Sequence, residues 1–159
     1  LIAAQDMVVT LSHSGYMKSQ PLSEYRAQKR GGRGKQATAT KEDDWIEQLF
    51  IANTHDYMLC FSNRGRMYWL KVWEVPQGSR ASRGKPIVNM FPLQDGEKIT
   101  VVLPLFGANS QFPEDRYIFM STAHGVVKKT SLSDFSNPRK AGIIACDLDE
   151  GDFLIAPTL

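Results

Sequence analysis

At residues 57 to 71 the chain reads Tyr57-Met-Leu-Cys-Phe-Ser-Asn-Arg-Gly65-Arg-Met-Tyr-Trp-Leu-Lys71. Two mostly apolar runs flank a short polar segment that ends in a glycine. Because glycine adopts the positive φ of a tight turn without steric cost, the pattern predicts two antiparallel strands joined by a hairpin.

The same pattern occurs three times in the 159 residues, centred on Gly15, Gly65 and Gly125. After each glycine, the second and seventh residues are apolar and the ninth is an acid. A second glycine then follows at Gly34, Gly84 or Gly142, and each unit continues with a strand-like run, an acidic turn and a closing apolar strand. The third strands are expected at residues 37 to 40, 87 to 91 and 143 to 148, and the closing strands at 46 to 52, 99 to 105 and 153 to 156.

Four strands in a unit of roughly fifty residues are typical of a propeller blade. The sequence therefore predicts an all-β fold of four-stranded antiparallel blades, β-propeller-like, with almost no helix. The repeats cover residues 7 to 56, 57 to 115 and 116 to 159, and a turn-rich surface insertion lies at 104 to 115. Three blades do not close a ring, so we expect a truncated third repeat in one partial domain that self-associates or lacks its remainder.

Composition indicates a soluble, cytoplasmic protein without a membrane segment, because neither a spanning apolar run nor a signal peptide is present. Cys60 and Cys146 lie inside apolar strand-like runs, and both are expected to be reduced core residues. Trp45, Trp69 and Trp73 are expected in the core or between blades rather than as platforms for nucleic-acid bases.

Positive charge is concentrated in the first part of the chain: residues 1 to 90 hold thirteen Lys and Arg against eight acids. The densest cluster is residues 26 to 35, where glycines keep the backbone open and arginines offer rigid forks for phosphate oxygens. A solvated loop is the alternative, but the corresponding loops at 77 to 85 and 137 to 142 are also basic, which favours a track for a polyanion such as DNA. The candidate DNA-binding residues are Gln28, Lys29, Arg30, Gly31, Gly32, Arg33, Gly34, Lys35, Arg80, Arg83, Lys85, Arg139 and Lys140.

Further cations near the hairpins, or beside the first basic loop, either extend this track or only solubilise the surface. These weaker candidates are Lys18, Arg26, Arg64, Arg66, Lys71, Lys128 and Lys129.

Enzymatic motifs fail on their context. The Gly34-Lys35 and Gly84-Lys85 pairs lack the earlier glycine and the Ser or Thr of a phosphate-binding loop. The three histidines are scattered, and no His or Cys pair has the spacing of metal ligands. We therefore expect no catalytic residue, no metal site and no cofactor in this chain, and we interpret the acidic turns as turn chemistry.

The run Gln28-Lys-Arg-Gly-Gly-Arg-Gly34 is similar to the gyrase box, the seven-residue signature of the DNA gyrase A C-terminal domain. Its surroundings resemble that family along the whole chain, as in Gln20-Pro-Leu-Ser-Glu-Tyr25 and Pro76-Gln-Gly-Ser-Arg80. Lys29 stands where the family often has arginine, and Arg33 where lysine is common; both retain the charge.

The resemblance implies a six-bladed β-pinwheel, of which this chain covers about half, with strands exchanged between blades and duplex DNA wrapped on a basic rim. By the same resemblance, the box at 28 to 34 is expected to fix the wrap, so that a parent type IIA topoisomerase introduces negative supercoils. The parent is expected to contain a second A subunit and to use ATP through a separate B subunit. The resemblance also implies that the DNA-cleaving tyrosine and the magnesium site belong to other segments of the parent.

Three alternatives stay open. A topoisomerase IV C-terminal domain shares the blades but has a degraded or absent box. A propeller scaffold would use its basic loops to contact acidic proteins. A small enzyme in the central channel would need titratable groups converging on the axis, and the sequence shows none.

Overall fold

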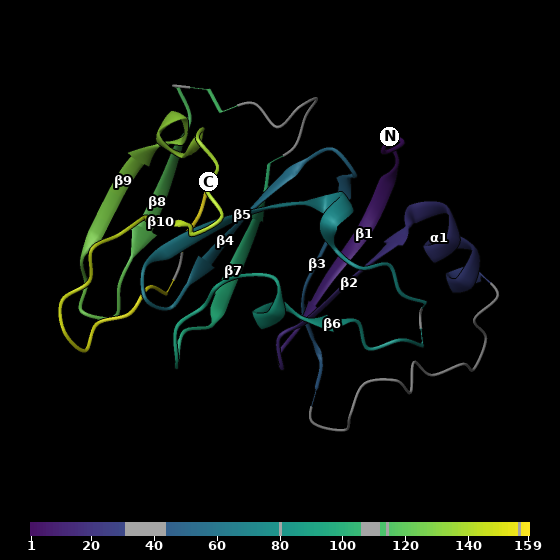
Figure 1. Cartoon of the computed structure of the whole chain (residues 1–159), viewed down its shortest axis with the longest axis horizontal. Helices are drawn as coiled ribbons and strands as arrows, with labels where there is room; N and C mark the ends of the chain where they lie inside the picture. Colours follow the sequence, from purple (N-terminus) through teal and green to yellow (C-terminus); the bar gives the residue numbers. More distant parts are fainter. Residues whose placement is uncertain (31–43, 80, 106–111, 114, 156) are drawn as a thin grey trace.

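The computed structural model describes residues 1 to 30, 44 to 79, 81 to 105, 112 to 113, 115 to 155 and 157 to 159, without the side chains of residues 29 and 30. Three β-hairpins lie across the molecule in chain order, from the N-terminal hairpin at the right of Figure 1 to the third at its left. The all-β architecture expected from the repeats is confirmed.

Each hairpin has the turn that its glycine predicts. The hairpins are β1 (Asp6–Ser12) with β2 (Tyr16–Pro21), β4 (Tyr57–Ser62) with β5 (Arg66–Lys71), and β8 (Tyr117–Ser121) with β9 (Val127–Ser131). The φ angles of Gly15, Gly65 and Gly125 are 87°, 78° and 87°. These values lie in the region that side-chain-bearing residues rarely adopt, so glycine sets the register of each pair.

Two sheets are completed by a strand from the following repeat. The closing strands β3 (Ile46–Asn53) and β7 (Ile99–Pro104) pair with β1 and β4. On the opposite side, β6 (Lys85–Pro86) pairs with β2, and β10 (Ile143–Ile144) pairs with β5. The resulting orders are β3-β1-β2-β6 and β10-β5-β4-β7, which is the strand exchange that the resemblance implies.

The middle sheet lies between two hydrophobic cores. Met58 and Cys60 of β4 point into a cluster shared with the first sheet, whereas Leu59 and Phe61 point into a cluster shared with the third hairpin. Because successive side chains of a strand face opposite sides, one apolar strand contributes to both hydrophobic cores, one on each face of the middle sheet. Cys60 and Cys146 are both buried and free, as expected.

The expectation of almost no helix misses one α-helix, α1 (Leu22–Arg30). Its sequence favours a helix locally: Glu24 lies in the first turn, strong helix formers follow, and Lys29 and Arg30 lie in the last turn. The second and third repeats have short 3₁₀ turns at this place, η1 (Val72–Glu74) and η3 (Leu132–Phe135).

The predicted third strands differ from the structure. Of residues 143 to 148, only Ile143–Ile144 (β10) are strand. The prediction of a strand at 87 to 91 is wrong: the strand that pairs with β2 is β6, which ends at Pro86, and the apolar residues after it form the 3₁₀ turn η2 (Ile87–Asn89). The range 37 to 40 and most of the predicted insertion at 104 to 115 lie outside the described residues. The core expectation for two tryptophans is wrong, because Trp45 and Trp73 are 53% and 47% exposed. Trp69 does lie between blades, with Nε1 donating to the Phe135 carbonyl at 2.7 Å.

Candidate nucleic-acid interface

The basic loop of the second repeat is fastened at both ends to strand β2 of the first repeat. At its start, Ser19 N donates to Pro76 O and Gly78 N to Ser19 O, each at 3.0 Å. At its end, Lys85 pairs with Met17 in the β6–β2 ladder. The loop therefore follows the preceding hairpin, at the lower right of Figure 1.

Gly84 permits this close approach. A Cβ built on Gly84 would lie 2.5 Å from the Met17 carbonyl oxygen, and its φ is +90°. Gly142 of the third repeat meets the second hairpin in the same way, since its Cβ would lie 2.8 Å from the carbonyl oxygen of Met67. Two of the three second glycines of the sequence pattern are thus contact points between repeats, and the other, Gly34, lies outside the described residues.

Lys18 holds the middle of the same loop. Its Nζ donates to the carbonyls of Ser79 at 3.1 Å and Ser82 at 2.8 Å. Partial burial lowers the pKa of this lysine. Lys18, a weaker DNA-binding candidate in the sequence, is therefore engaged with the protein itself.

Two of the three candidate cations of this loop are described. The Arg83 guanidinium lies over the Tyr16 ring, with Cζ 3.9 Å from the ring centroid. Lys85 is exposed in β6. Arg80 lies outside the described residues.

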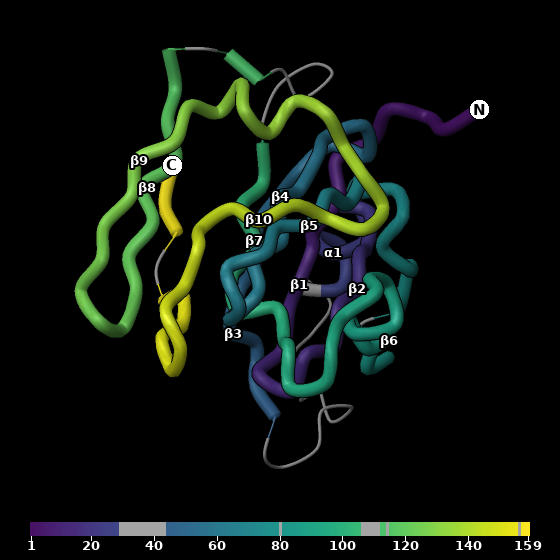
Figure 2. Tube along the Cα trace, turned by 60° about the vertical axis from the view of Figure 1, so that its left-hand side comes forward, coloured from purple at the N-terminus to yellow at the C-terminus, as the bar shows by residue number. Residues whose placement is uncertain are grey.

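The third repeat places its basic loop at the equivalent position on the second hairpin. Ala145 N and Cys146 N both donate to the carbonyl of Gly65, at 2.8 and 3.0 Å. Arg66 Nη2 donates to Ala141 O at 2.7 Å, close to the two candidate cations Arg139 and Lys140, which are exposed. Figure 2 shows this loop, in yellow-green, running from the third hairpin back across to β5.

The first basic loop begins in α1. Gln28 Oε1 accepts a hydrogen bond from Gln20 Nε2 at 2.7 Å, which joins the helix to strand β2. Lys29 and Arg30 end the helix. The remaining candidates Gly31, Gly32, Arg33, Gly34 and Lys35 lie outside the described residues.

The other weaker candidates divide by their partners. Arg64 donates to Gln94 Oε1 at 3.4 Å and to the carbonyl of Asp95, and Lys71 Nζ donates to His55 O at 2.7 Å. Lys128 Nζ donates to Ala145 O at 3.2 Å. Lys129 lies 4.1 Å above the Tyr117 ring, and Arg26 is exposed on α1.

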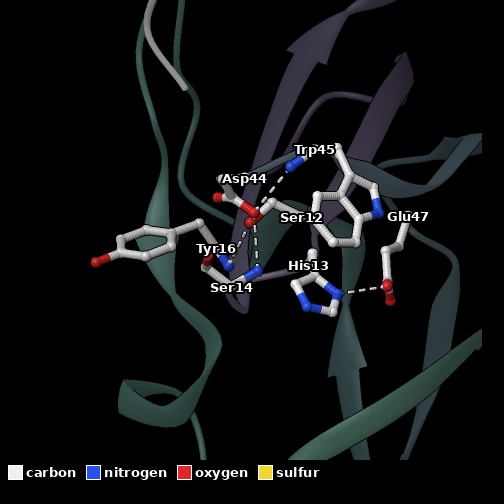
Figure 3. Close-up of polar contacts among 7 residues, drawn as sticks. All are labelled: Ser12, His13, Ser14, Tyr16, Asp44, Trp45 and Glu47. Carbon is white, nitrogen blue, oxygen red and sulfur yellow. Dashed lines mark hydrogen bonds and ion pairs between the residues drawn. The ribbon is translucent and has the colours of Figure 1, made fainter. Parts of the chain in front are cut away.

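In the first and third repeats, an aspartate of the acidic turn binds both the hairpin tip and the residue that follows the turn. Asp44 Oδ1 accepts from Ser14 N at 2.8 Å and from Trp45 N at 3.0 Å (Figure 3). Asp152 Oδ1 does the same for His124 N and Phe153 N. Burial alone would raise the pKa of Asp44, but these hydrogen bonds hold it below its ordinary value.

Figure 3 also shows the exposed Trp45 ring stacked on His13, with ring centroids 3.9 Å apart. His13 Nδ1 lies 2.6 Å from Glu47 Oε1. In the described part of the chain, the ion pairs are this one and His124 with Asp152, so Arg83, Lys85, Arg139 and Lys140 pair with no carboxylate there.

No role for Tyr16 follows from the sequence. The residue after the hairpin glycine is Tyr16, Arg66 or Val126 in the three repeats, so the repeat pattern contains no signal for an aromatic at that place. Its contact with Arg83 depends on the exchange of β6 between repeats, which brings two distant segments together.

The model of the DNA gyrase C-terminal domain, β-propeller, matches this chain in three segments, residues 6–53, 56–105 and 116–159. The chain belongs to the DNA gyrase C-terminal domain family. The matched segments contain the three hairpins with their closing strands or bridges.

Curated relatives of this family member are DNA gyrase A subunits. The chain is 58% identical over 155 residues to the DNA gyrase A subunit of Haemophilus influenzae, covering 98% of this chain and 17% of the relative. It is 53% identical to that of Escherichia coli strain K12, covering all of this chain and 18% of the relative. The chain therefore spans less than a fifth of the length of these relatives.

Two solved structures share the fold. The C-terminal domain of DNA topoisomerase IV superposes with a TM-score of 0.82 at 27% identity, over 99% of this chain and 46% of the other. The DNA gyrase A C-terminal domain superposes with a TM-score of 0.65 at 24% identity, over 96% and 47%. Within the part of the chain that the structure describes, no helix is long and apolar enough to cross a membrane.

Proposed function

We propose that this chain binds duplex DNA through its basic loops, independently of base sequence, and holds it in a bent path. The observation that supports the proposal is the repeated placement of exposed cations. Lys85 ends one basic loop, and Arg139 and Lys140 lie in the next; the two loops contact equivalent places on successive hairpins, although the cations themselves occupy different positions in the two loops. Basic loops that recur on successive hairpins suit a polyanion with a repeating charge, such as the phosphate backbone of a duplex.

The electrostatics of the loops suit a polyanionic partner. The described loop cations are not neutralised by a carboxylate of the described residues, so a polyanion gains their full attraction. The described parts of the second and third basic loops contain no α-helix or β-ribbon of the kind that reads base edges in the major groove, and only the first basic segment begins in a helix, α1. Binding through phosphates positions DNA without reading its sequence.

Bending is the costly part of this function. Smoothly bending 20 to 30 bp by 40 to 90° costs on the order of 1 to 6 kcal/mol. Phosphate contacts from several loops must therefore together offset the bending free energy. The box at 28 to 34 is proposed to fix where the wrap ends, and thereby its handedness. In the parent enzyme that wrap would direct strand passage toward negative supercoiling.

The remaining parts of the proposal concern that parent. It would act in the cytoplasm with a B subunit, together with a second A subunit, and there ATP and magnesium would serve segments outside this chain. No cofactor and no catalytic residue are assigned to the chain itself. DNA wrapping is its proposed contribution to an ATP-dependent topoisomerase.

The topoisomerase IV alternative has one supporting observation, the TM-score of 0.82 to that domain. The two relatives compared above, at 58% and 53% identity, are nevertheless gyrase subunits, and the box motif is intact in the sequence. Gyrase-type wrapping is therefore the function we propose.

The test measures duplex binding by the 159-residue chain with the double variant Arg139→Ala, Lys140→Ala. Removing two phosphate contacts should reduce the slope of log K against log salt by about 1.8, since each neutralised phosphate contributes about 0.9. The matched control is Lys98→Ala, Arg116→Ala, which removes two exposed cations outside the basic loops.

The control should leave the slope nearly unchanged. Equal losses in the two double variants would show only a general attraction between a cation-rich protein and DNA. Absence of duplex binding by the unaltered chain, with binding to acidic proteins instead, would favour the scaffold alternative.

A second measurement addresses the box in the assembled parent enzyme. Replacing Lys29, Arg30 and Arg33 by alanine should abolish negative supercoiling of a plasmid while relaxation persists, because the other loops still attract DNA. Undiminished supercoiling would contradict the role of the box. Loss of both activities calls for circular dichroism, and a native spectrum would then also contradict it.

A further inference from the structure

The contact between Tyr16 and Arg83 joins two repeats. Tyr16 begins β2 of the first repeat, whereas Arg83 belongs to the basic loop of the second. The guanidinium carbon lies 3.9 Å from the centroid of the tyrosine ring. An arginine over an aromatic face is attracted by the ring's quadrupole and keeps its in-plane N–H donors for other partners.

Arg83 is held by this ring rather than by an acid. No carboxylate in the described ranges forms a salt bridge with it, and its buried Nε has no hydrogen-bond partner among those residues. Its charge is therefore restrained in position without being neutralised. A phosphate approaching the guanidinium would meet a cation whose attraction no neighbouring acid reduces.

Tyr16 and the loop that carries Arg83 are both held by backbone contacts. Tyr16 N donates to Ser12 Oγ at 3.1 Å, and Tyr16 pairs with Pro86 in the β6–β2 ladder. On the loop side, Ile87 N donates to the Gly15 carbonyl at 2.8 Å, and Lys18 holds the carbonyls of the loop. Little rotamer freedom is left for Arg83 to lose when it binds a ligand.

A second stacked pair provides a comparison. Lys71 Nζ lies 3.9 Å from the centroid of the Tyr57 ring, the same separation as in the Tyr16–Arg83 pair. Its ammonium, however, donates to the carbonyl of His55 at 2.7 Å. Lys71 is thus directed into the protein, and the Tyr57 ring serves packing at the seam.

We infer that Tyr16 is a positioning residue, which presents the guanidinium of Arg83 to a phosphate of duplex DNA across the seam between the first two repeats. This inference rests on the proposed function. It makes the affinity of the second basic loop depend on a side chain of the first repeat.

The experiment titrates duplex binding against salt for the 159-residue chain carrying Tyr16→Leu, Tyr16→Phe, Arg83→Ala, or Tyr16→Leu with Arg83→Ala. Tyr16→Leu should lower the affinity severalfold and reduce the salt slope by up to about 0.9, as Arg83→Ala does. Tyr16→Phe keeps the ring and should bind like the unaltered chain. The double variant should be no weaker than Arg83→Ala alone, because both changes remove one contact.

Tyr57→Leu is the matched control, since it removes a tyrosine from the same kind of stacked pair and should leave the salt slope unchanged. Additive losses in the double variant would overturn the inference. So would a Tyr16→Phe variant as weak as Tyr16→Leu, or an equal change of slope from Tyr57→Leu. If Arg83→Ala weakens binding and Tyr16→Leu does not, the proposed function survives and only the role of Tyr16 falls.

Discussion

The second and third hairpins share one sequence pattern but differ in burial. Leu59 of β4 and Phe119 of β8 both lie six residues before their hairpin glycine, yet Leu59 is 0% exposed and Phe119 is 46% exposed. The second hairpin has a neighbouring sheet on each face, whereas β8 alternates between buried and exposed residues. Burial of a position is therefore set by the neighbouring repeats and not by the repeat's own sequence.

The largest expected effect concerns that pair of positions. Leu59→Ala should lower the free energy of unfolding by about 2–5 kcal/mol, because it leaves a cavity in a close-packed core. Phe119→Ala should cost about 1 kcal/mol or less, since half of the ring is already in solvent. Urea unfolding of both variants measures the difference. Equal losses would mean that Phe119 is covered in solution, for example by a second copy of the chain.

Two glycines of the second and third repeats, Gly84 in the basic loop and Gly125 in the third hairpin, should differ less strongly in the cost of substitution. Alanine at Gly125, where no atom lies within 4 Å of the added Cβ, should cost only the backbone strain of positive φ, about 1–2 kcal/mol. Alanine at Gly84 adds a clash with the Met17 carbonyl oxygen and should cost more. Thermal unfolding compares the two. A Gly84→Ala variant as stable as Gly125→Ala would show that the loop moves away from β2 without loss.

The smallest effect concerns the acidic turns, which the first and third repeats share. The pKa of Asp44 is lower when folded, so its stabilisation is present above the ordinary aspartate pKa of about 3.9 and is lost as pH falls through the lowered value. Asp44→Asn should therefore melt below the unaltered chain at neutral pH and approach it in acid. A difference in melting temperature that stays constant over this range would contradict the role of the carboxylate.

The hairpins, the first two closing strands and the buried cysteines follow from the sequence because each depends on local pattern. The third closing strand, predicted at 153 to 156, is wrong for the described residues, where Leu154 forms only an isolated bridge with Thr122. The glycine fixes a turn, and alternate apolar residues fix the strands beside it. The same reasoning places the basic loops at equivalent points of each repeat. It needs no knowledge of which repeat lies beside which.

The features that the sequence does not predict depend on contacts between segments far apart in the chain. Two residues, Lys85–Pro86, are too short to be recognised as a strand until β2 is beside them. Trp45 has the composition of a core residue but lies at the exposed edge of the first repeat, stacked on His13. Lys18 resembles any surface cation, and only the loop of the next repeat shows what it binds.

The exchange of β6 and β10 has a consequence for synthesis on the ribosome. The sheet that starts at Asp6 is complete only when Pro86 has emerged from the ribosome. In the same way, the sheet built on β4 and β5 is complete only when Ile144 has emerged. Each new stretch of chain therefore finishes the preceding blade before it can finish its own. A nascent chain paused between repeats leaves unpaired the edge of the second strand of its most recently made hairpin, and a nearby chaperone or a second nascent chain could pair with that edge.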